Sequence, residues 1–228
     1  IMKLINDKYG ITEADFMSSE LTMVPSYPAR ELGFDRSMIA AYGHDDRVCA
    51  YPSYKALFDS TDDLNTSMIV LADKEEIGSD GVTGMQSLAY MDIIDELAKT
   101  FRASPAKVRA NSMCLSADVN AGFDPGFPEV AERSNTCFLN QGVVMTKFTG
   151  SGGKSGTSDA SGEFVGKIRR IFDDANVIWQ TGELGKVDQG GGGTVAMYIA
   201  NNNIDTIDVG VPVLSMHSPY EVIAKADL

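Results

Sequence analysis

The sequence predicts an α/β protein in which a mixed, largely parallel sheet is sandwiched by helices. Two short apolar runs, TSMIVLA (66–72) and NSMCLSA (111–117), have the length and composition of buried strands. The segment between them carries apolar residues at helical spacing from Val82 to Leu97. A buried strand, a long helix and a second buried strand form a βαβ-like unit, which is typical of parallel sheets covered by helices.

The second half of the chain continues this alternation. We expect strands at GVVMTKF (142–148) and NVIWQTG (176–182) and a last strand in DVGVPVLSMHS (208–218). Between the first two strands we expect a loop at 149–162 and a helix at 163–172, and a short helix should follow the glycine run QGGGG (189–193). A length of 228 residues suits one domain, or a large part of one.

The composition argues against two classes of partner. The formal net charge is −13, whereas a nucleic-acid backbone or an anionic membrane surface requires clustered Lys and Arg. No stretch approaches the apolar length of a membrane span. The three cysteines, Cys49, Cys114 and Cys137, are far apart and odd in number, which argues against a disulfide framework. We therefore expect a cytoplasmic protein that has neither nucleic acid nor membrane as a partner.

Four polar motifs stand at or near predicted strand ends or sharp turns: HDDR (44–47), DKEEIGS (73–79), SADVN (116–120) and SMHSP (215–219). Ligands of open α/β sheets gather beyond the carboxyl ends of the strands. Taken singly, each motif has a structural explanation, because an Asp pair before a helix is usually an N-cap and a strand-end Asp usually forms a turn. A lone His after an apolar run is usually hydrogen-bonded structure. Only the combination points to chemistry.

Together the motifs carry the ligand types of a two-metal site. Two divalent ions held close together need a bridging carboxylate, further carboxylates and imidazoles, and a free carboxylate that acts as a base toward water. The ligand types are supplied by Asp45, Glu76, Asp118 and His217, and Glu75 is left over. Adjacent residues in an extended or turning segment point in different directions, so Glu75 and Glu76 can have different roles.

In this order, HDDR, DKEEIGS, SADVN and DVGVPVLSMHS resemble the M18 family of metallo-aminopeptidases, relatives of aspartyl aminopeptidase among the cocatalytic zinc exopeptidases. The resemblance implies a zinc exopeptidase-like catalytic domain with two zinc ions per site. It implies release of the N-terminal residue of short peptides through a di-zinc-activated water, with a Glu as general base. Cobalt or manganese would also suit such a carboxylate-rich site. A homo-oligomer, as large as a dodecamer, is implied as well.

The resemblance also assigns a role to each residue. It makes Asp45 the carboxylate that bridges the two metals and Asp46 an orienting neighbour. It makes Glu75 the general base, and Glu76 and Asp118 terminal ligands. It makes His217 the imidazole ligand of the second metal.

Two glycine-rich segments are candidates for substrate contact. The run QGGGGT lacks the GxxxxGK[ST] spacing of a phosphate loop. In the family this region lies close to the substrate, and at Gly192 and Gly193, before Thr194, backbone can approach a ligand without a Cβ in the way. A tight turn without ligand contact explains the run equally well. Lys154, in the loop 149–162, either contacts substrate or is solvated.

The chain lacks two features of the family pattern, and their absence affects how much of a catalytic domain we expect it to contain. Family members carry an earlier histidine in an HxD-type motif, ahead of an inserted dimerisation domain, and neither occurs here. His44 stands directly beside the proposed bridge and is a poor substitute. We expect 1–228 to be the C-terminal portion of a catalytic domain, with the N-terminal part and the dimerisation domain absent from this chain. A degenerate relative with one incomplete metal position is the alternative.

Other functions stay open. The related M42-type aminopeptidases and M20-type deacylases share the metal geometry, and a catalytically inactive relative could serve in assembly or binding. An upstream HxD motif in the gene product would argue against the inactive relative. The sequence identifies no arginine that must bind an acidic side chain of the substrate, so it does not predict which N-terminal residue is preferred.

Overall fold

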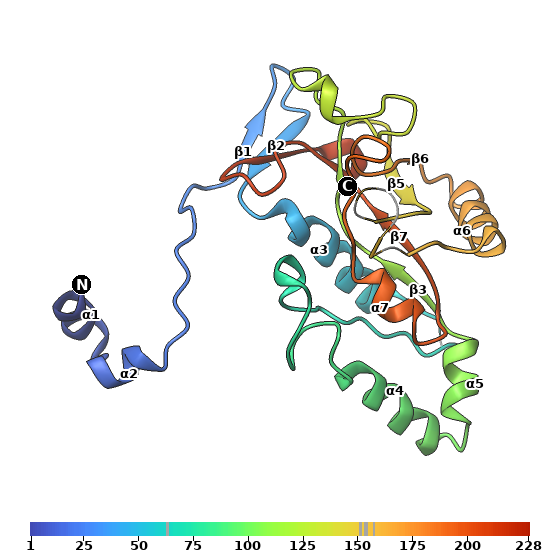
Figure 1. Cartoon of the computed structure of the whole chain (residues 1–228), viewed down its shortest axis with the longest axis horizontal. Coiled ribbons are helices and arrows are strands. Elements are labelled where there is room, and N and C mark those ends of the chain that lie inside the picture. Colours follow the sequence, from blue (N-terminus) through green and yellow to red (C-terminus); the bar gives the residue numbers. More distant parts are fainter. Residues whose placement is uncertain (63, 151, 153–154, 157) are drawn as a thin grey trace.

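The computed structural model describes residues 1–62, 64–150, 152, 155–156 and 158–228 (Figure 1). At its centre is a four-stranded sheet in the order β3-β7-β5-β6, formed by β3 (Met113–Ser116), β5 (Val143–Thr146), β6 (Trp179–Thr181) and β7 (Asp205–Gly210). The β3–β7 and β5–β6 pairs are parallel and the β5–β7 pair is antiparallel. The prediction of a mixed, largely parallel sheet is therefore confirmed.

Two smaller sheets adjoin this centre. One is antiparallel and has the order β1-β2-β9, and the other is a parallel pair; their strands are β1 (Arg30–Leu32), β2 (Met38–Ala41), β9 (Glu221–Ala224), β4 (Asn120–Ala121) and β8 (Pro212–Val213). Because β9 pairs with β2, the turn between β8 and β9 lies beside the segment that follows β2. This pairing brings the motifs HDDR (44–47) and SMHSP (215–219) together.

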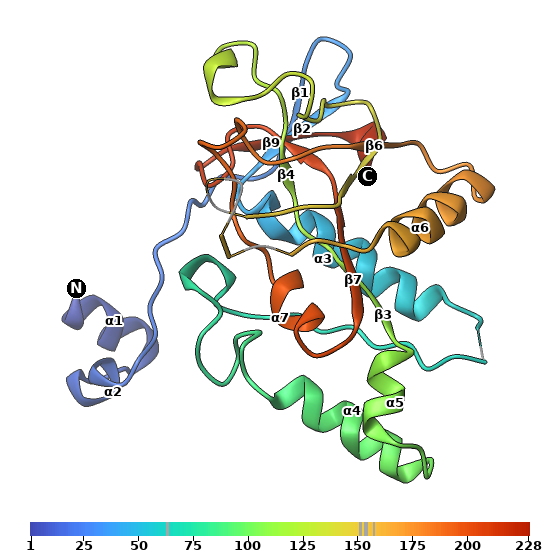
Figure 2. The same cartoon turned by 45° about the vertical axis from the view of Figure 1, so that its right-hand side comes forward.

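The helices lie on both sides of the central sheet (Figures 1 and 2). Their bounds are α3 (His44–Asp59), α4 (Ala89–Thr100), α5 (Pro105–Ala110), α6 (Gly162–Asp174) and α7 (Ala196–Ala200), with single turns η1 (Glu75–Ile77), η2 (Pro128–Val130) and η3 (Lys225–Asp227). At the N-terminus, α1 (Met2–Tyr9) and α2 (Glu13–Met17) stand apart from the sheet in both views.

The opposite faces of the sheet are covered by α6 and by the pair α4 and α7. From α6, Phe164 and Ile168 lie one turn apart and pack against Ile207 of β7. On the other face, Cys114 of β3 packs against the cluster that α4 and α7 form. Cys114 pairs with the residue before Ile207, and side chains alternate along a strand, so the two packing clusters lie on opposite faces. The predicted sandwich of helices is thus present.

The prediction of a strand at 66–72 is wrong for the described structure. This segment forms no strand ladder with other described residues, and only the isolated bridge between Asp73 and Gly84 lies nearby. Met68, Val70 and Leu71 are 42%, 41% and 64% exposed. Apolar composition indicates burial, but a strand also needs a neighbour for its backbone hydrogen bonds, and no described strand lies beside this one.

The predicted helix after 66–72 begins later than its apolar spacing suggested. It starts at Ala89, because the residues before it form turns around Gly81 and Gly84. The predicted helix at 163–172 and the strands at 111–117, 142–148 and 176–182 are present as α6, β3, β5 and β6. Among the described residues, no helix has the length and apolarity needed to cross a bilayer. The three cysteines are all free.

Candidate metal centre

Asp45 and Asp46 lie at the start of α3, directly after the turn that follows β2. Their backbone angles are not helical, so this first turn directs their side chains away from the ordinary helical positions. The peptide bond between the two residues is cis. The Asp45 side chain is 8% exposed, which places a carboxylate in a largely dry position. A carboxylate at such a position requires a cation, a proton or several hydrogen bonds.

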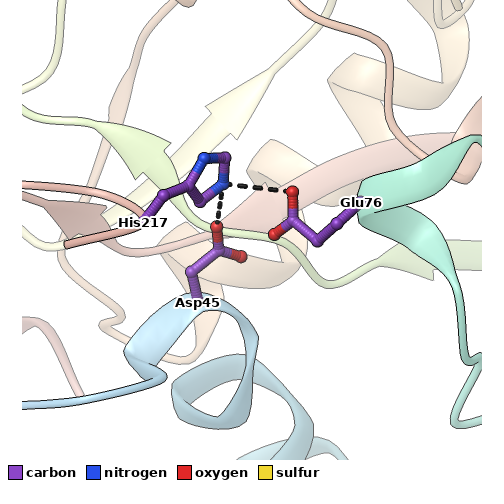
Figure 3. A group of neighbouring side chains, drawn as sticks. All are labelled: Asp45, Glu76 and His217. Carbon is purple, nitrogen blue, oxygen red and sulfur yellow. Dashed lines mark ion pairs between the residues drawn. The ribbon is translucent and has the colours of Figure 1, made fainter. Parts of the chain in front are cut away.

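Donor groups from three separate segments of the chain, those of Asp45, Glu76 and His217, lie together. His217, in the turn between β8 and β9, directs its Nε2 atom at Asp45 Oδ2, 2.8 Å away, and at Glu76 Oε2 of η1, 3.1 Å away. Figure 3 shows one nitrogen of the imidazole ring joined by dashed lines to both carboxylates. The structure therefore brings together three of the predicted site residues that the sequence separates widely.

A second trio of acidic groups shares Asp45 with the first. Carboxylate oxygens of Asp45, Asp46 and Asp118 lie within 4.8 Å of one another, as do the donor atoms of Asp45, Glu76 and His217. Asp118 lies just beyond the carboxyl end of β3. The two trios thus form one cluster through the Asp45 that they share.

The chemistry of the donors fits divalent metal ions. Imidazole and carboxylate donors are the common ligands of catalytic zinc, and carboxylates also suit manganese or cobalt. Asp46 Oδ1 is buried and has no hydrogen-bond partner among the described residues. A buried carboxylate oxygen without a partner is costly, and a cation nearby would remove that cost. The described donors are therefore suited to hold a metal ion.

Burial and the neighbouring acidic groups raise the pKa values of the carboxyls in this cluster. Burial, followed by the Glu76 carboxylate, raises the pKa of Asp45 to about 6, and burial with the neighbouring Asp45 raises the pKa of Asp46 to about 7. The pKa of Asp118 lies well above its usual range because of burial and then of Asp46. Each of these shifts reflects an ionised carboxylate that is disfavoured where no cation neutralises it.

Metal binding to this cluster is expected to weaken as pH falls. Protons and cations compete for the same oxygens. With pKa values of about 7 for Asp46 and about 6 for Asp45, half of the Asp46 carboxyls hold a proton near neutral pH and half of the Asp45 carboxyls near pH 6. Zinc affinity, measured by competition with a chromogenic chelator, should therefore fall between about pH 8 and about pH 5, with protons released on binding near pH 6. An affinity that is the same at both ends of this range would contradict the site.

Glu75 and Glu76 are adjacent in η1 but face different surroundings. Whereas Glu76 points to His217, Glu75 belongs to neither trio and lines a hollow of about 320 Å³. Burial, followed by the charge of Asp45, raises the pKa of Glu75. The turn that separates the two side chains starts at Lys74 and ends at Gly78, both with positive φ. Glu75 is thus a carboxylate close to the cluster and open to the hollow.

The hollow beside Glu75 contains two of the predicted glycine-rich residues and two residues that the sequence did not single out. Gly193 and Thr194 line it, together with Met197 and Tyr198 of α7. Gly192 does not line it, and its carbonyl oxygen accepts a hydrogen bond from the backbone N–H of Gly150 at 3.0 Å. The predicted contact of Lys154 falls outside the described residues.

His44 is not part of the cluster. Its Nε2 atom lies 3.2 Å from the carbonyl oxygen of Ile39, so the ring has a local partner in the strand before α3. Among the described residues, His217 is the one imidazole that belongs to a donor trio. The trio around Asp46 and Asp118 accordingly consists of carboxylates alone.

Comparisons with known proteins point to a single family. All of 1–228 match the sequence model of the family described as aminopeptidase I zinc metalloprotease (M18). A probable M18 family aminopeptidase 1 from Clostridium acetobutylicum is 48% identical over 232 residues, which cover all of this chain and 50% of that protein. One from Thermotoga maritima is 43% identical and is matched over 51% of its length. The chain thus spans about half the length of these relatives.

Solved structures give the same result. The crystal structure of aminopeptidase I from Clostridium acetobutylicum has a TM-score of 0.94 at 47% identity, over 99% of this chain and 49% of that one. The M18 structure from Thermotoga maritima has a TM-score of 0.92 at 43% identity, over 99% of this chain and 51% of that one. The dodecamer of mApe1 from Saccharomyces cerevisiae has a TM-score of 0.71 at 24% identity, over 88% and 45%, and shares the fold alone.

Proposed function

Because this chain belongs to the aminopeptidase I zinc metalloprotease family (M18), we propose that it carries the active-site residues of an aminopeptidase that releases the N-terminal residue of short peptides. The observation that supports this most strongly is the pair of donor trios that share Asp45. A shared carboxylate is what two neighbouring divalent ions require. Zinc is the metal we propose, two ions per site, with cobalt or manganese as substitutes.

Each side chain of the cluster has a distinct role in this proposal. Asp45, Glu76 and His217 would hold one ion, and Asp45 with Asp118 would hold the other, with Asp46 beside them as an orienting neighbour. Ions bound there supply a Lewis acid for the scissile carbonyl and make water more acidic.

Glu75 is the proton carrier in this proposal. It takes a proton from the attacking water and passes it to the leaving amine. A raised pKa supports this role, because a base of very low pKa would hold the proton too weakly to pass it on. The hollow that Glu75 shares with Gly193, Thr194, Met197 and Tyr198 is the proposed place of the substrate.

The test is hydrolysis of short peptides by the full-length gene product, with free and with N-acetylated termini. We expect cleavage of the free peptides alone, loss of cleavage with a chelator and recovery with zinc or cobalt. Preferred cleavage of acetylated peptides would indicate an M20-type deacylase instead. Bound metal without any cleavage would indicate an inactive binding or assembly relative. The panel also reads out the preferred N-terminal residue.

We also propose that 1–228 form the C-terminal portion of a catalytic domain in a cytoplasmic homo-oligomer, up to a dodecamer. The length of the relatives supports a further portion, since this chain matches about half of them. Exposed apolar side chains support it too: Met113 and Leu115 of the edge strand β3 are 52% and 49% exposed, and Leu71 is 64% exposed. The native mass of the full-length protein, from light scattering, measures the assembly.

A further inference from the structure

Glu221 is a buried acid that the predicted site does not include. It is the first residue of β9, and it is 2% exposed. Its carboxylate accepts two backbone hydrogen bonds from different parts of the chain. Oε2 accepts from the N–H of Asp45 at 2.9 Å, and Oε1 accepts from the N–H of His217 at 2.7 Å.

We propose that Glu221 is a positioning residue that fixes Asp45 and His217 relative to each other, so that both can bind one ion. The inference rests on the proposed function of the cluster. Asp45 lies in the first turn of α3, and His217 lies in the turn between β8 and β9, so no continuous element connects them. One carboxylate that holds both backbones sets the distance between the two side chains, which meet at 2.8 Å.

Backbone hydrogen bonds hold the turn between β8 and β9, from which Glu221 starts β9, in one conformation. Leu214 and Val222 exchange backbone hydrogen bonds of 2.9 and 3.0 Å and close the base of the turn on either side. Inside the turn, the N–H of Ser218 donates to the carbonyl oxygen of Ser215 at 3.0 Å. His217 has a φ of 66°, a conformation that a non-glycine residue keeps only where its neighbours hold it. The bond from its N–H to Glu221 is one such constraint.

Glu221→Gln is the informative substitution, because it keeps the size of the side chain but leaves a single acceptor oxygen. One of the two backbone N–H groups then faces an amide NH₂ group, which cannot accept its hydrogen bond. The affinity of the full-length protein for zinc should fall by about 10- to 100-fold, the usual effect of losing a partner that orients a ligand. The visible absorption spectrum of the cobalt-loaded protein should change as well, since it reports ligand geometry.

Asp227 provides a matched control within the same chain. It is also 2% exposed, and its two oxygens accept from the backbone N–H groups of Asn140 and Gly142, both at 2.8 Å, but it belongs to neither donor trio. Asp227→Asn should lower the thermal midpoint yet leave zinc affinity and the cobalt spectrum as in the parent protein. A general loss of packing would affect both variants alike.

The outcomes separate the two levels of the proposal. An unchanged zinc affinity and cobalt spectrum in Glu221→Gln, or an equal loss in Asp227→Asn, would overturn the role of Glu221 while the metal site stands. A parent protein that binds neither zinc nor cobalt would overturn the proposed function itself. If Glu221→Gln does not fold, Glu221→Asp takes its place: it keeps the charge but is shorter, and it too must bind zinc more weakly than the parent.

Discussion

Glu75→Gln in the full-length protein is expected to lower kcat by about 10²- to 10⁴-fold, the usual contribution of a general base, while zinc content stays unchanged. The reason is that Glu75 faces the hollow and belongs to neither donor trio. The amide has nearly the same size, so substrate can still bind, and KM should change little. Steady-state kinetics and metal analysis of the same preparation provide both readouts.

Glu76→Gln is the matched control for this prediction. It makes the same chemical change at the adjacent residue, but it removes a donor that lies 3.1 Å from His217 Nε2. This variant should bind zinc more weakly, and excess zinc should restore part of its activity. Glu75→Gln should not respond to added zinc. If Glu75→Gln kept most of its activity, or if it lost its zinc, the roles of the two acids would be wrong.

Asp45→Asn is expected to remove both ions and to reduce turnover to background. Asp45 is the residue that the two trios have in common, so its carboxylate is the one whose loss affects both positions. The neutral amide is a weaker donor, and it leaves the remaining acids without a shared ligand. Zinc content after dialysis, measured by atomic emission, tests this directly.

Asp118→Asn separates a bridging role from a general effect of lost charge. Asp118 belongs to one trio alone, so this variant should retain about one ion of the proposed pair. If Asp45→Asn and Asp118→Asn lose the same amount of zinc, Asp45 is not a bridge. If Asp45→Asn retains a full complement of zinc, neither trio holds a metal as proposed.

The sequence predicted the donor cluster because turns and strand ends carry the relevant residues, although the strand expected before Glu76 is not formed. Asp45, Glu76, Asp118 and His217 all stand at or near a turn or strand end, and in an α/β sheet such positions come together. The separation of Glu75 from Glu76 was predictable as well, since adjacent residues in a turn point in different directions. The family resemblance assigned roles that residue types alone leave open.

Other features depend on tertiary contacts that a sequence does not display. Glu221 stands at the start of the strand EVIA, where an acid is ordinarily solvent-exposed, and its burial depends on which two backbones meet there. Met197 and Tyr198 are apolar helix residues whose place beside Glu75 follows from the position of α7. At 66–72 the apolar composition indicated a strand, but pairing depends on a neighbour that composition does not reveal.

The measurement that bears most directly on the metal centre is anomalous diffraction at the zinc absorption edge from crystals of the full-length protein. We predict two zinc peaks that flank the carboxylate of Asp45, one beside Glu76 and His217 and the other beside Asp118, with Glu75 bound to neither. A single peak, or a peak coordinated by Glu75, would contradict the two-ion site and the role of Glu75 as a free base.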